Sequence, residues 1–294
     1  MLRREYGKIL SSCTSFKIGG PTFCWVEPQN IDDILEAVSE AERGKKLLTI
    51  IGKGSNVLVK DEGFDGIIIN LGKEFDYIER EDNEIIRIGS GCLISRFVRQ
   101  SVEWGLAGGE FLSGIPGSIG GAMFMNAGVR GIENPDAMDE IKDIIIDVDI
   151  LDLKDKKRKI LKGGDIGFSY RYSGLDGKCI LGARVKLRKD MKESVLNRMC
   201  LFMERREWIK KTCFPSAGSV FKNPGRDNPA GRLIELCGLK GRRIGGAEIS
   251  GAHANFIVNR GSAMSKDVMD LIDIARSSVR EKFGIELELE LRIL

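Results

Sequence analysis

The segment GIPGSIGGAMFMNAG, residues 114–128, is the first candidate for a ligand-binding site in this sequence. It is rich in glycine, and glycine lets backbone N–H groups approach a ligand without a Cβ in the way. No lysine follows to make a phosphate-binding P-loop, and no G-x-G-x-x-G opens the segment. The glycines alone leave two interpretations: a backbone cradle for phosphate groups, or a tight loop packed against the core.

A shorter glycine turn, GKGSN at residues 52–56, follows a strand expected at residues 46–51. Ser55 and Asn56 can donate side-chain hydrogen bonds where the glycines admit a ligand, although a simple turn would look the same. Such turns at the carboxyl ends of strands are where open α/β sheets bind ligands. Two glycine cradles in separate regions suit a long ligand with two phosphates, such as FAD.

Two polar side chains offer reaction chemistry in the second half of the chain. Arg171, in FSYRYSG (168–174), can bind a carboxylate in bidentate fashion, but a surface arginine on a strand is the common alternative. Ser219, in SAGSVFKNP (216–224), lies in no G-x-S-x-G elbow, so it is not predicted to be a hydrolase nucleophile. It is either a proton donor or a turn serine.

The C-terminal segment GIELELELRIL, residues 284–294, alternates strictly between leucine and charged residues. This alternation predicts a half-exposed strand with the leucines on one side and Glu286, Glu288 and Glu290 on the other. A carboxylate there is functional only if one end of the acidic face meets a cleft. In a dry site, the two neighbouring carboxylates would raise the pKa of Glu290.

The chain contains one histidine, His253, and this excludes several chemistries. A metal site with two histidine ligands cannot form, and a Ser-His-Asp triad would have to use this residue. Proton transfer therefore falls largely to Ser, Tyr, Lys, Asp or Glu. We interpret His253 as a packed, hydrogen-bonded residue in preference to a catalytic one.

Composition narrows the class of protein further. The net charge of +3 is too small to suggest a protein that binds nucleic acid. The basic run at 154–162 is interpreted as a solvated hairpin or loop. The N-terminus lacks the apolar core of a secretion signal, and no stretch approaches the roughly 18 apolar residues of a membrane span. The seven cysteines form no C-x-x-C pair, which indicates reduced thiols, no metal site and a cytoplasmic location.

Hydrophobic periodicity and capping residues predict the elements that must position these side chains. The expected boundaries near residues 72 and 190 divide the chain into an α/β region, a β-rich region and a mainly helical region. Helices are expected at 30–43, 95–104, 193–211, 228–238 and 266–284. Strands are expected at 46–51, 67–69, 84–88, 144–150, 180–187, 255–259 and 284–294.

Several motifs occur in a fixed order from about Ser15 to Leu294: TSFKIGG, GKGSN, EFLSGIPGSIGGAMFMNAG, YRYS, SAGSVFKNP, AGRLIE with GLKG, GGAEIS with HANFIVN, and LELELR. Together they resemble the UDP-N-acetylenolpyruvoylglucosamine reductase family. The resemblance implies an α+β protein with the vanillyl-alcohol-oxidase/PCMH-type FAD-binding fold. It also implies two α/β FAD-binding subdomains, 1–72 and 73–190, and an α+β substrate-binding subdomain, 191–294. The short segment after Arg171 is similar to the shorter second subclass of the family.

The resemblance also implies an activity. NADPH would reduce a non-covalently bound FAD, which would then reduce UDP-N-acetylenolpyruvoylglucosamine to UDP-N-acetylmuramate. This reaction belongs to peptidoglycan precursor synthesis and so to cell-wall biogenesis, cell shape and cell division. The protein is expected to be a cytoplasmic monomer that binds neither nucleic acid nor membrane. Two alternatives stay open: a flavin oxidase on the same fold, and a non-catalytic protein that binds flavin or a nucleotide sugar.

The motifs carry the family's functional residues onto this sequence. Arg171, Ser219 and Glu290 match the catalytic residues. Gly117, Gly120 and Gly121 are expected to make room for FAD, with Asn126 available to the flavin side. The full set of expected FAD contacts is Gly52, Lys53, Gly54, Ser55, Asn56, Gly114, Ile115, Pro116, Gly117, Ser118, Ile119, Gly120, Gly121, Asn126, Ala127 and Gly128. The expected substrate contacts are Tyr170, Lys222, Asn223 and Arg292.

Overall fold

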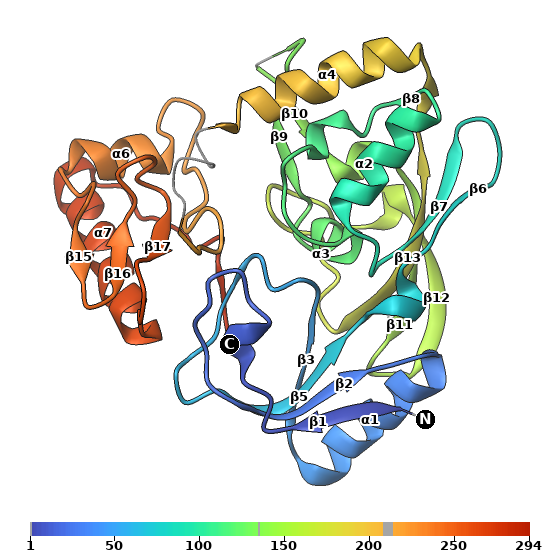
Figure 1. The fold of residues 1–294 in the computed structure, drawn as a ribbon, viewed down its shortest axis with the longest axis horizontal. Helices are drawn as coiled ribbons and strands as arrows, with labels where there is room; N and C mark the ends of the chain where they lie inside the picture. Colours follow the sequence, from blue (N-terminus) through green and yellow to red (C-terminus); the bar gives the residue numbers. More distant parts are fainter. Residues whose placement is uncertain (1, 135, 208–213) are drawn as a thin grey trace. The chain divides into compact units, whose positions relative to one another are not determined.

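The computed structural model describes residues 2–134, 136–207 and 214–294, which divide into two units (Figure 1). The first unit comprises Met1–Arg4, Trp25–Gly52 and Ile67–Arg206. The second comprises Glu5–Cys24, Lys53–Gly66 and Glu207–Leu294. In the described parts of the chain, no helix is both long and apolar enough to cross a membrane.

An antiparallel five-stranded sheet forms the centre of the first unit, in the order β12-β11-β13-β7-β6. Its strands are β6 (Ile78–Arg80), β7 (Ile85–Gly89), β11 (Ile145–Asp152), β12 (Lys157–Lys162) and β13 (Lys178–Lys186). The short helix α3 (Ile119–Phe124) packs on β7 and β13, and α2 (Ile94–Glu103) packs on α4 (Lys192–Glu204). A shared apolar core joins these elements.

Helix α2 confirms the sequence-based expectation closely. Its buried face includes Phe97, Val98, Ser101 and Val102, the apolar stripe that the sequence predicted. The helix ends at Glu103 with Trp104 as its C-cap, and Gly105 follows with a φ of +61°, a conformation that glycine adopts without strain.

The N-terminal sheet has the order β1-β2-β5-β3, with β1 (Arg3–Tyr6), β2 (Thr22–Glu27), β3 (Leu47–Ile51) and β5 (Phe64–Asn70). Strand β3 was expected to be buried, but it lies at the sheet edge and Leu47 is 65% exposed. Helix α1 (Ile31–Gly44) begins where Asn30 accepts a hydrogen bond from the N–H of Asp33 at 2.9 Å. Lys45 follows the helix as its C-cap in the left-handed conformation, with a φ of +49°.

In the second unit, a three-stranded antiparallel sheet packs with two helices around its own apolar core. The strands are β15 (Arg243–Ile244), β16 (Ala247–Ile249) and β17 (Ile257–Asn259), and the helices are α6 (Ala230–Leu236) and α7 (Ser265–Phe283). A short parallel pair joins β4 (Val57–Leu58) to β18 (Arg292–Ile293). Asp61 holds the start of α7 by accepting hydrogen bonds from the N–H and hydroxyl of Ser265.

The remaining short elements complete the chain. Antiparallel pairs form between β9 (Gly128–Arg130) and β10 (Met138–Glu140), and between β8 (Leu106–Ala107) and β14 (Arg188–Lys189). Short 3-10 helices cover η1 (Leu10–Ser12), η2 (Lys73–Phe75), η3 (Glu110–Leu112), η4 (Ile141–Asp143) and η5 (Gly163–Asp165).

Helix α4 departs from the expected division of the chain. The sequence placed a helix at 193–211 in the third region, but α4 ends at Glu204 and belongs to the first unit. There, Arg198 forms ion pairs with Glu110 at 2.9 Å and Asp190 at 2.6 Å. Residues 208–211 of the expected helix lie outside the described residues.

The C-terminal segment is not the continuous strand that its alternation predicted. Regular pairing covers only β18, and one isolated bridge joins Leu289 to Phe221. The expected burial pattern nevertheless holds, because Leu287 and Leu291 are buried while Glu286 and Glu288 are exposed. Alternation fixes which side chains face the core, whereas pairing needs a neighbouring strand along the whole length.

Candidate functional site

The glycine-rich segment 114–128 is a tight loop that leads into α3. Gly114 and Gly117 have φ values of +74° and +135°, where other residues would be strained. In the same unit, a Cβ added to Gly52 would lie only 2.6 Å from the Ser118 hydroxyl oxygen. The end of β3 therefore packs directly against this loop, and position 52 requires glycine for that contact.

The backbone N–H groups of this loop divide into two sets. Those of Ile119 and Gly120 donate to the carbonyls of Cys92 at 2.9 Å and Ser90 at 2.8 Å. Within the described ranges, the N–H groups of Gly117 and Ser118 donate to no backbone carbonyl. An anion cradle needs backbone N–H groups that are not already bonded to carbonyls, and Gly117 and Ser118 provide two of them. The N–H groups of Ile119 and Gly120 instead hold the loop in place.

The two adjacent glycines of α3 face different surroundings. A Cβ on Gly120 would lie 2.8 Å from the Ser90 Cβ, so this glycine serves the packing of α3. This packing is sufficient to require glycine at position 120, and a contact between Gly120 and FAD stays a prediction. A Cβ on Gly121 would meet the Ser118 hydroxyl at 3.7 Å, an ordinary contact.

Asn126 was expected to be available to the flavin side, but its side chain is fully buried. The amide nitrogen donates to the carbonyl of Ser169 at 2.9 Å, and the amide oxygen accepts from the N–H of Lys142 at 3.3 Å. Its φ is +42°. Asn126 therefore ties the loop to the segment that carries Arg171 instead of presenting its side chain to a ligand.

Arg171 lies in a tight turn and not on a strand. The bridge between Ser169 and Tyr172 closes the turn, and Arg171 has a φ of +56°, which is rare for a bulky residue. Its Nη2 donates to the carbonyl of Gly128 at 2.8 Å, and its guanidinium lies 5.1 Å from the ring centre of Tyr170. The guanidinium is thus anchored at the end of the glycine-rich loop, and backbone strain of this kind often marks functional residues.

The turn 53–56 lies in the second unit and is supported by Ser15. The backbone N–H of Ser15 donates to the carbonyl of Gly54 at 3.1 Å, and the Ser15 hydroxyl donates to the carbonyl of Ser216 at 2.7 Å. Elsewhere in this turn, the N–H groups of Lys53 and Gly54 donate to no backbone carbonyl of the described residues. Asn56, expected to donate to a ligand, instead donates its amide N–H to the carbonyl of Glu290 at 3.0 Å.

Ser219 and Glu290 lie on paired segments of the second unit. The N–H of Glu290 donates to the carbonyl of Val220 at 2.9 Å, next to Ser219. Asn255 holds the same segment, because its side chain accepts from the N–H of Phe221 at 2.9 Å and donates to the Phe221 carbonyl at 2.8 Å. Sequence reasoning assigned no role to Ser15 or Asn255, since neither spacing nor composition marks a residue that binds backbone.

A cavity of about 350 Å³ opens beside Ser219. Its lining consists of Ser219, Asn223, Pro229, Gly231, Arg232, Glu235, Ala252, His253, Ala254 and Asn255. Asn223 is partly committed here, since its side-chain oxygen accepts the N–H of Ala230 at 3.0 Å. This cavity is the candidate site that the structure adds to the predicted residues of the second unit.

His253 is packed and hydrogen-bonded, as expected, and it also lines this cavity. Its Nδ1 accepts the N–H of Asn255 at 3.2 Å, and its ring contacts Phe256 edge to face with centres 5.3 Å apart. Burial lowers the pKa of His253 below its usual value, so the ring is neutral at pH 7. With Nδ1 as acceptor, the neutral ring carries its proton on Nε2 and can donate a hydrogen bond there.

The carboxylates beside Glu290 do not form the dry acidic cluster that the sequence suggested. Glu288 pairs with Lys222 at 3.4 Å, and Glu286 pairs with Arg280 at 3.6 Å. Their side chains are 76% and 66% exposed. Water and the paired cations therefore screen the charges of both side chains.

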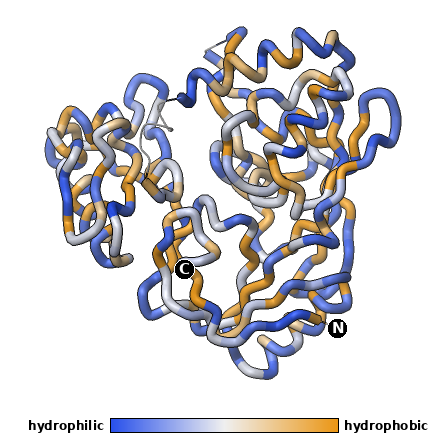
Figure 2. Tube along the Cα trace, viewed as in Figure 1, coloured by the Kyte–Doolittle hydropathy of each residue, from blue (hydrophilic) through white to orange (hydrophobic). Residues whose placement is uncertain are grey.

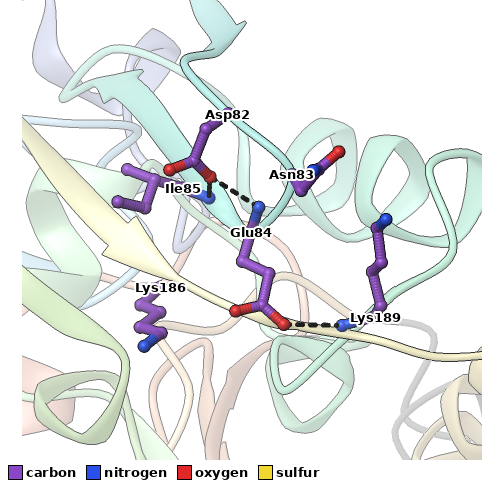
Figure 3. A pocket seen from close by; sticks show the side chains of 6 residues that line it. All are labelled: Asp82, Asn83, Glu84, Ile85, Lys186 and Lys189. Atoms are coloured by element: carbon purple, nitrogen blue, oxygen red, sulfur yellow. Dashed lines mark hydrogen bonds between the residues drawn. The ribbon is translucent and has the colours of Figure 1, made fainter.

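A second hollow lies in the first unit at the hydrophilic tip of the β6–β7 hairpin (Figures 2 and 3). Asp82 accepts the N–H groups of Glu84 and Ile85 at 2.7 and 2.8 Å, and Glu84 accepts the N–H of Lys189 at 3.4 Å. These bonds satisfy the polar groups of the turn itself. None of the predicted site residues lines this hollow.

Two buried thiols, Cys92 and Cys179, are held in their unreactive protonated form. Burial raises the pKa of Cys92 and of Cys179 to about 12, so both are protonated at neutral pH. The residues that the structure describes contain no group of three or more His, Cys, Asp or Glu able to hold a metal ion.

Known proteins are similar to this chain over nearly its whole length. Residues 209–294 match the family model "UDP-N-acetylenolpyruvoylglucosamine reductase, C-terminal domain", and residues 23–155 match "FAD binding domain". The UDP-N-acetylenolpyruvoylglucosamine reductase of Bacillus subtilis strain 168 is 39% identical over 99% of this chain and 95% of its own length. That of Caldicellulosiruptor saccharolyticus is 42% identical over 98% of this chain and 90% of its own length.

A solved structure resembles the fold over the same extent. The crystal structure of UDP-N-acetylenolpyruvylglucosamine reductase from Thermus caldophilus has a TM-score of 0.84 to this chain and 34% sequence identity. The match covers 100% of this chain and 99% of that one.

Proposed function

This chain belongs to the UDP-N-acetylenolpyruvoylglucosamine reductase family, and from that membership we propose its reaction. It is an FAD-dependent oxidoreductase with an α+β fold of the PCMH-type FAD-binding kind. It reduces the enolpyruvyl group of UDP-N-acetylenolpyruvoylglucosamine with NADPH, giving UDP-N-acetylmuramate for peptidoglycan precursor synthesis. The observation that carries this assignment is the full-length similarity to curated reductases at 36–42% identity.

The direct test uses the purified protein under anaerobic conditions. We expect a yellow protein whose flavin is bleached by NADPH and regains its colour when UDP-N-acetylenolpyruvoylglucosamine is added. A reduced protein that ignores this substrate would defeat the proposal. Rapid reoxidation by oxygen alone would favour the flavin-oxidase alternative, and a protein that NADPH does not bleach would favour a binding role.

The residues present fit FAD at the glycine-rich loop. Among the described residues, the N–H groups of Gly117 and Ser118 donate to no backbone carbonyl. At Gly121, the position that a Cβ would take has only the Ser118 hydroxyl near it, at 3.7 Å. We propose that these groups bind the FAD phosphates, and that Lys53 and Gly54 offer N–H groups of the same kind. When bound there, FAD would supply hydride transfer from NADPH to the enolpyruvyl methylene carbon. No covalent link is proposed, since the one histidine is packed beside Phe256.

We propose that three side chains act on the substrate: Arg171, Ser219 and Glu290. Hydride addition to an enol ether that carries a carboxylate builds negative charge on that carboxylate. The Arg171 guanidinium stabilises this charge. Ser219 then gives its hydroxyl proton to the α-carbon. Because a serine hydroxyl is a weak acid, we propose that the Glu290 carboxyl group assists the enolic form.

The cavity beside Ser219 is the proposed site of the substrate in the second unit. Asn223 and Arg232 offer polar groups to the nucleotide sugar, and the neutral His253 offers a hydrogen-bond donor. Tyr170, Lys222 and Arg292 remain proposed substrate contacts. Functionally, we still divide the chain at 72 and 190 into two FAD-binding subdomains and a substrate-binding subdomain.

Gly121→Val separates cofactor binding from folding. The Cβ of the new side chain meets the Ser118 hydroxyl at an ordinary distance, so we expect a folded protein with a thermal midpoint within a few degrees of the parent. Its bulk would fill the proposed phosphate cradle, so we expect colourless protein. Visible absorbance and circular dichroism measure the two properties.

Gly120→Val is the matched control for that variant. Its side chain would collide with Ser90, so we expect a stability loss of about 1–3 kcal/mol from overpacking. A yellow, fully loaded Gly121→Val protein would return the loop to a packing role.

Glu290→Gln tests the carboxyl group at constant size. We expect reoxidation by the enolpyruvyl substrate to slow by roughly 10²-fold, as for loss of acid–base assistance, while reduction by NADPH is unchanged. Glu288→Gln, in the same segment but 76% exposed, is the control and should react at the parent rate. A Glu290→Gln protein with near-full turnover would remove its catalytic role.

We also propose that the enzyme works as a cytoplasmic monomer. The support for the location is the set of scattered cysteines, which form no C-x-x-C pair and indicate reduced thiols. Sedimentation at micromolar concentration tests the oligomeric state. Because peptidoglycan needs this precursor, depletion in cells should disturb cell shape and division.

A further inference from the structure

The main chain at Glu290 lies between two short stretches of pairing. On one side, Leu289 forms an isolated bridge with Phe221, and on the other, β18 begins at Arg292. The N–H of Glu290 is bonded to the Val220 carbonyl. In a regular β-ladder, a neighbouring strand would also donate an N–H to the Glu290 carbonyl, but Glu290 is not part of a strand.

The side chain of Asn56 takes the place of that ladder bond. Its Nδ2 donates to the Glu290 carbonyl at 3.0 Å, and its own backbone carbonyl accepts the N–H of Arg292 at 3.0 Å. Asn56 therefore forms hydrogen bonds with both peptide groups that flank Leu291, through the Glu290 carbonyl and the Arg292 N–H. An amide side chain suits this role because it provides an N–H donor for a backbone carbonyl.

We propose that Asn56 is a positioning residue that sets the direction of the Glu290 carboxyl group, an inference that rests on the proposed function. With N–H and carbonyl both bonded, the peptide planes at Glu290 have fixed orientations, and these determine where the side chain points. A displacement of about 1 Å of a reacting group can cost roughly 10²-fold in rate. Asn56 acts on the substrate half of the reaction and not on cofactor binding.

The test compares two half-reactions in Asn56→Ala and Asn56→Asp. Alanine removes the amide, and aspartate keeps its size but offers no N–H to the carbonyl. We expect flavin content and the rate of reduction by NADPH to stay within about twofold of the parent. Anaerobic reoxidation by UDP-N-acetylenolpyruvoylglucosamine should slow by roughly 10- to 100-fold in both variants.

A double variant shows whether Asn56 works through Glu290. If it does, Asn56→Ala combined with Glu290→Gln should be no slower in reoxidation than Glu290→Gln alone. Asn70→Ala provides the matched control, because Asn70 donates in the same way to the carbonyls of Ile51 and Gly52, beside the proposed cofactor loop. It should lower flavin content and leave reoxidation of the loaded fraction near the parent rate.

Three results would overturn the inference while leaving the proposed function intact. They are loss of flavin in the Asn56 variants, equal slowing of both half-reactions, and additive slowing in the double variant. Parent enzyme that the enolpyruvyl substrate cannot reoxidise would overturn the proposed function itself, and the inference with it. Circular dichroism and thermal midpoints establish that each variant is folded before its rates are compared.

Discussion

Ser219→Ala is expected to give a yellow protein that NADPH reduces at the parent rate but that UDP-N-acetylenolpyruvoylglucosamine reoxidises roughly 10²–10⁴-fold more slowly. Alanine lacks the hydroxyl proposed to protonate the α-carbon. The backbone of the segment stays fixed, since Asn255 holds Phe221 and the Val220 carbonyl holds Glu290. The change is therefore confined to one oxygen atom.

Anaerobic stopped-flow absorbance measures the two half-reactions separately. Ser216→Ala is the control, because Ser216 is in the same segment and offers its backbone carbonyl, not its hydroxyl, to Ser15. We expect this control to react within a few-fold of the parent in both steps. Reoxidation of Ser219→Ala at the parent rate would show that the proton comes from another group.

The sequence predicts best where the local pattern and the tertiary contacts agree. The apolar stripe of α2 and its stop at Gly105 predict the helix to within one residue at each end. Residues Ile67–Ile69 form the buried middle of β5, as their continuous apolar run indicated. The family and its fold followed from the order of the motifs, which no single element would have given.

The predictions that fail depend on partners distant in the chain. The terminal alternation correctly indicates burial of Leu287 and Leu291, but a full strand would need a neighbour that only Phe221 and β4 partly provide. Glycine density in 114–128 does not reveal which N–H groups are already bonded, nor that Ser90 lies against Gly120. Asn126 was assigned to a ligand because nothing local shows its bond to Ser169.

The candidate site also depends on partners that are distant in the chain. The types of Arg171, Ser219 and Glu290 indicate their chemistry, but their supports come from other segments: Gly128, Asn255 and Asn56. These supports are backbone carbonyls or neutral amides, which leave no charge pattern or spacing in the sequence. The residues proposed to carry the reaction could therefore be named from the sequence, whereas the residues that hold them in place could not.

Arg171→Lys is expected to slow the enolpyruvyl half-reaction by roughly 10²–10³-fold, with flavin content unchanged and reduction by NADPH near the parent rate. Lysine keeps the positive charge, and as an L-residue it meets the same strain at a φ of +56°. What it loses is the planar guanidinium, which can bond the Gly128 carbonyl and still offer N–H groups to a carboxylate. The expected defect thus arises from geometry at constant charge.

Arg205→Lys is the control that makes this result interpretable. Arg205 also donates to backbone carbonyls in the first unit, those of Arg130 at 3.4 Å and Gly131 at 3.0 Å, and no substrate contact is proposed for it. If Arg171 served only to hold the glycine-rich loop, the two substitutions would lower the thermal midpoint similarly and affect both half-reactions. A selective loss of enolpyruvyl reduction in Arg171→Lys alone requires that the guanidinium acts on the substrate carboxylate.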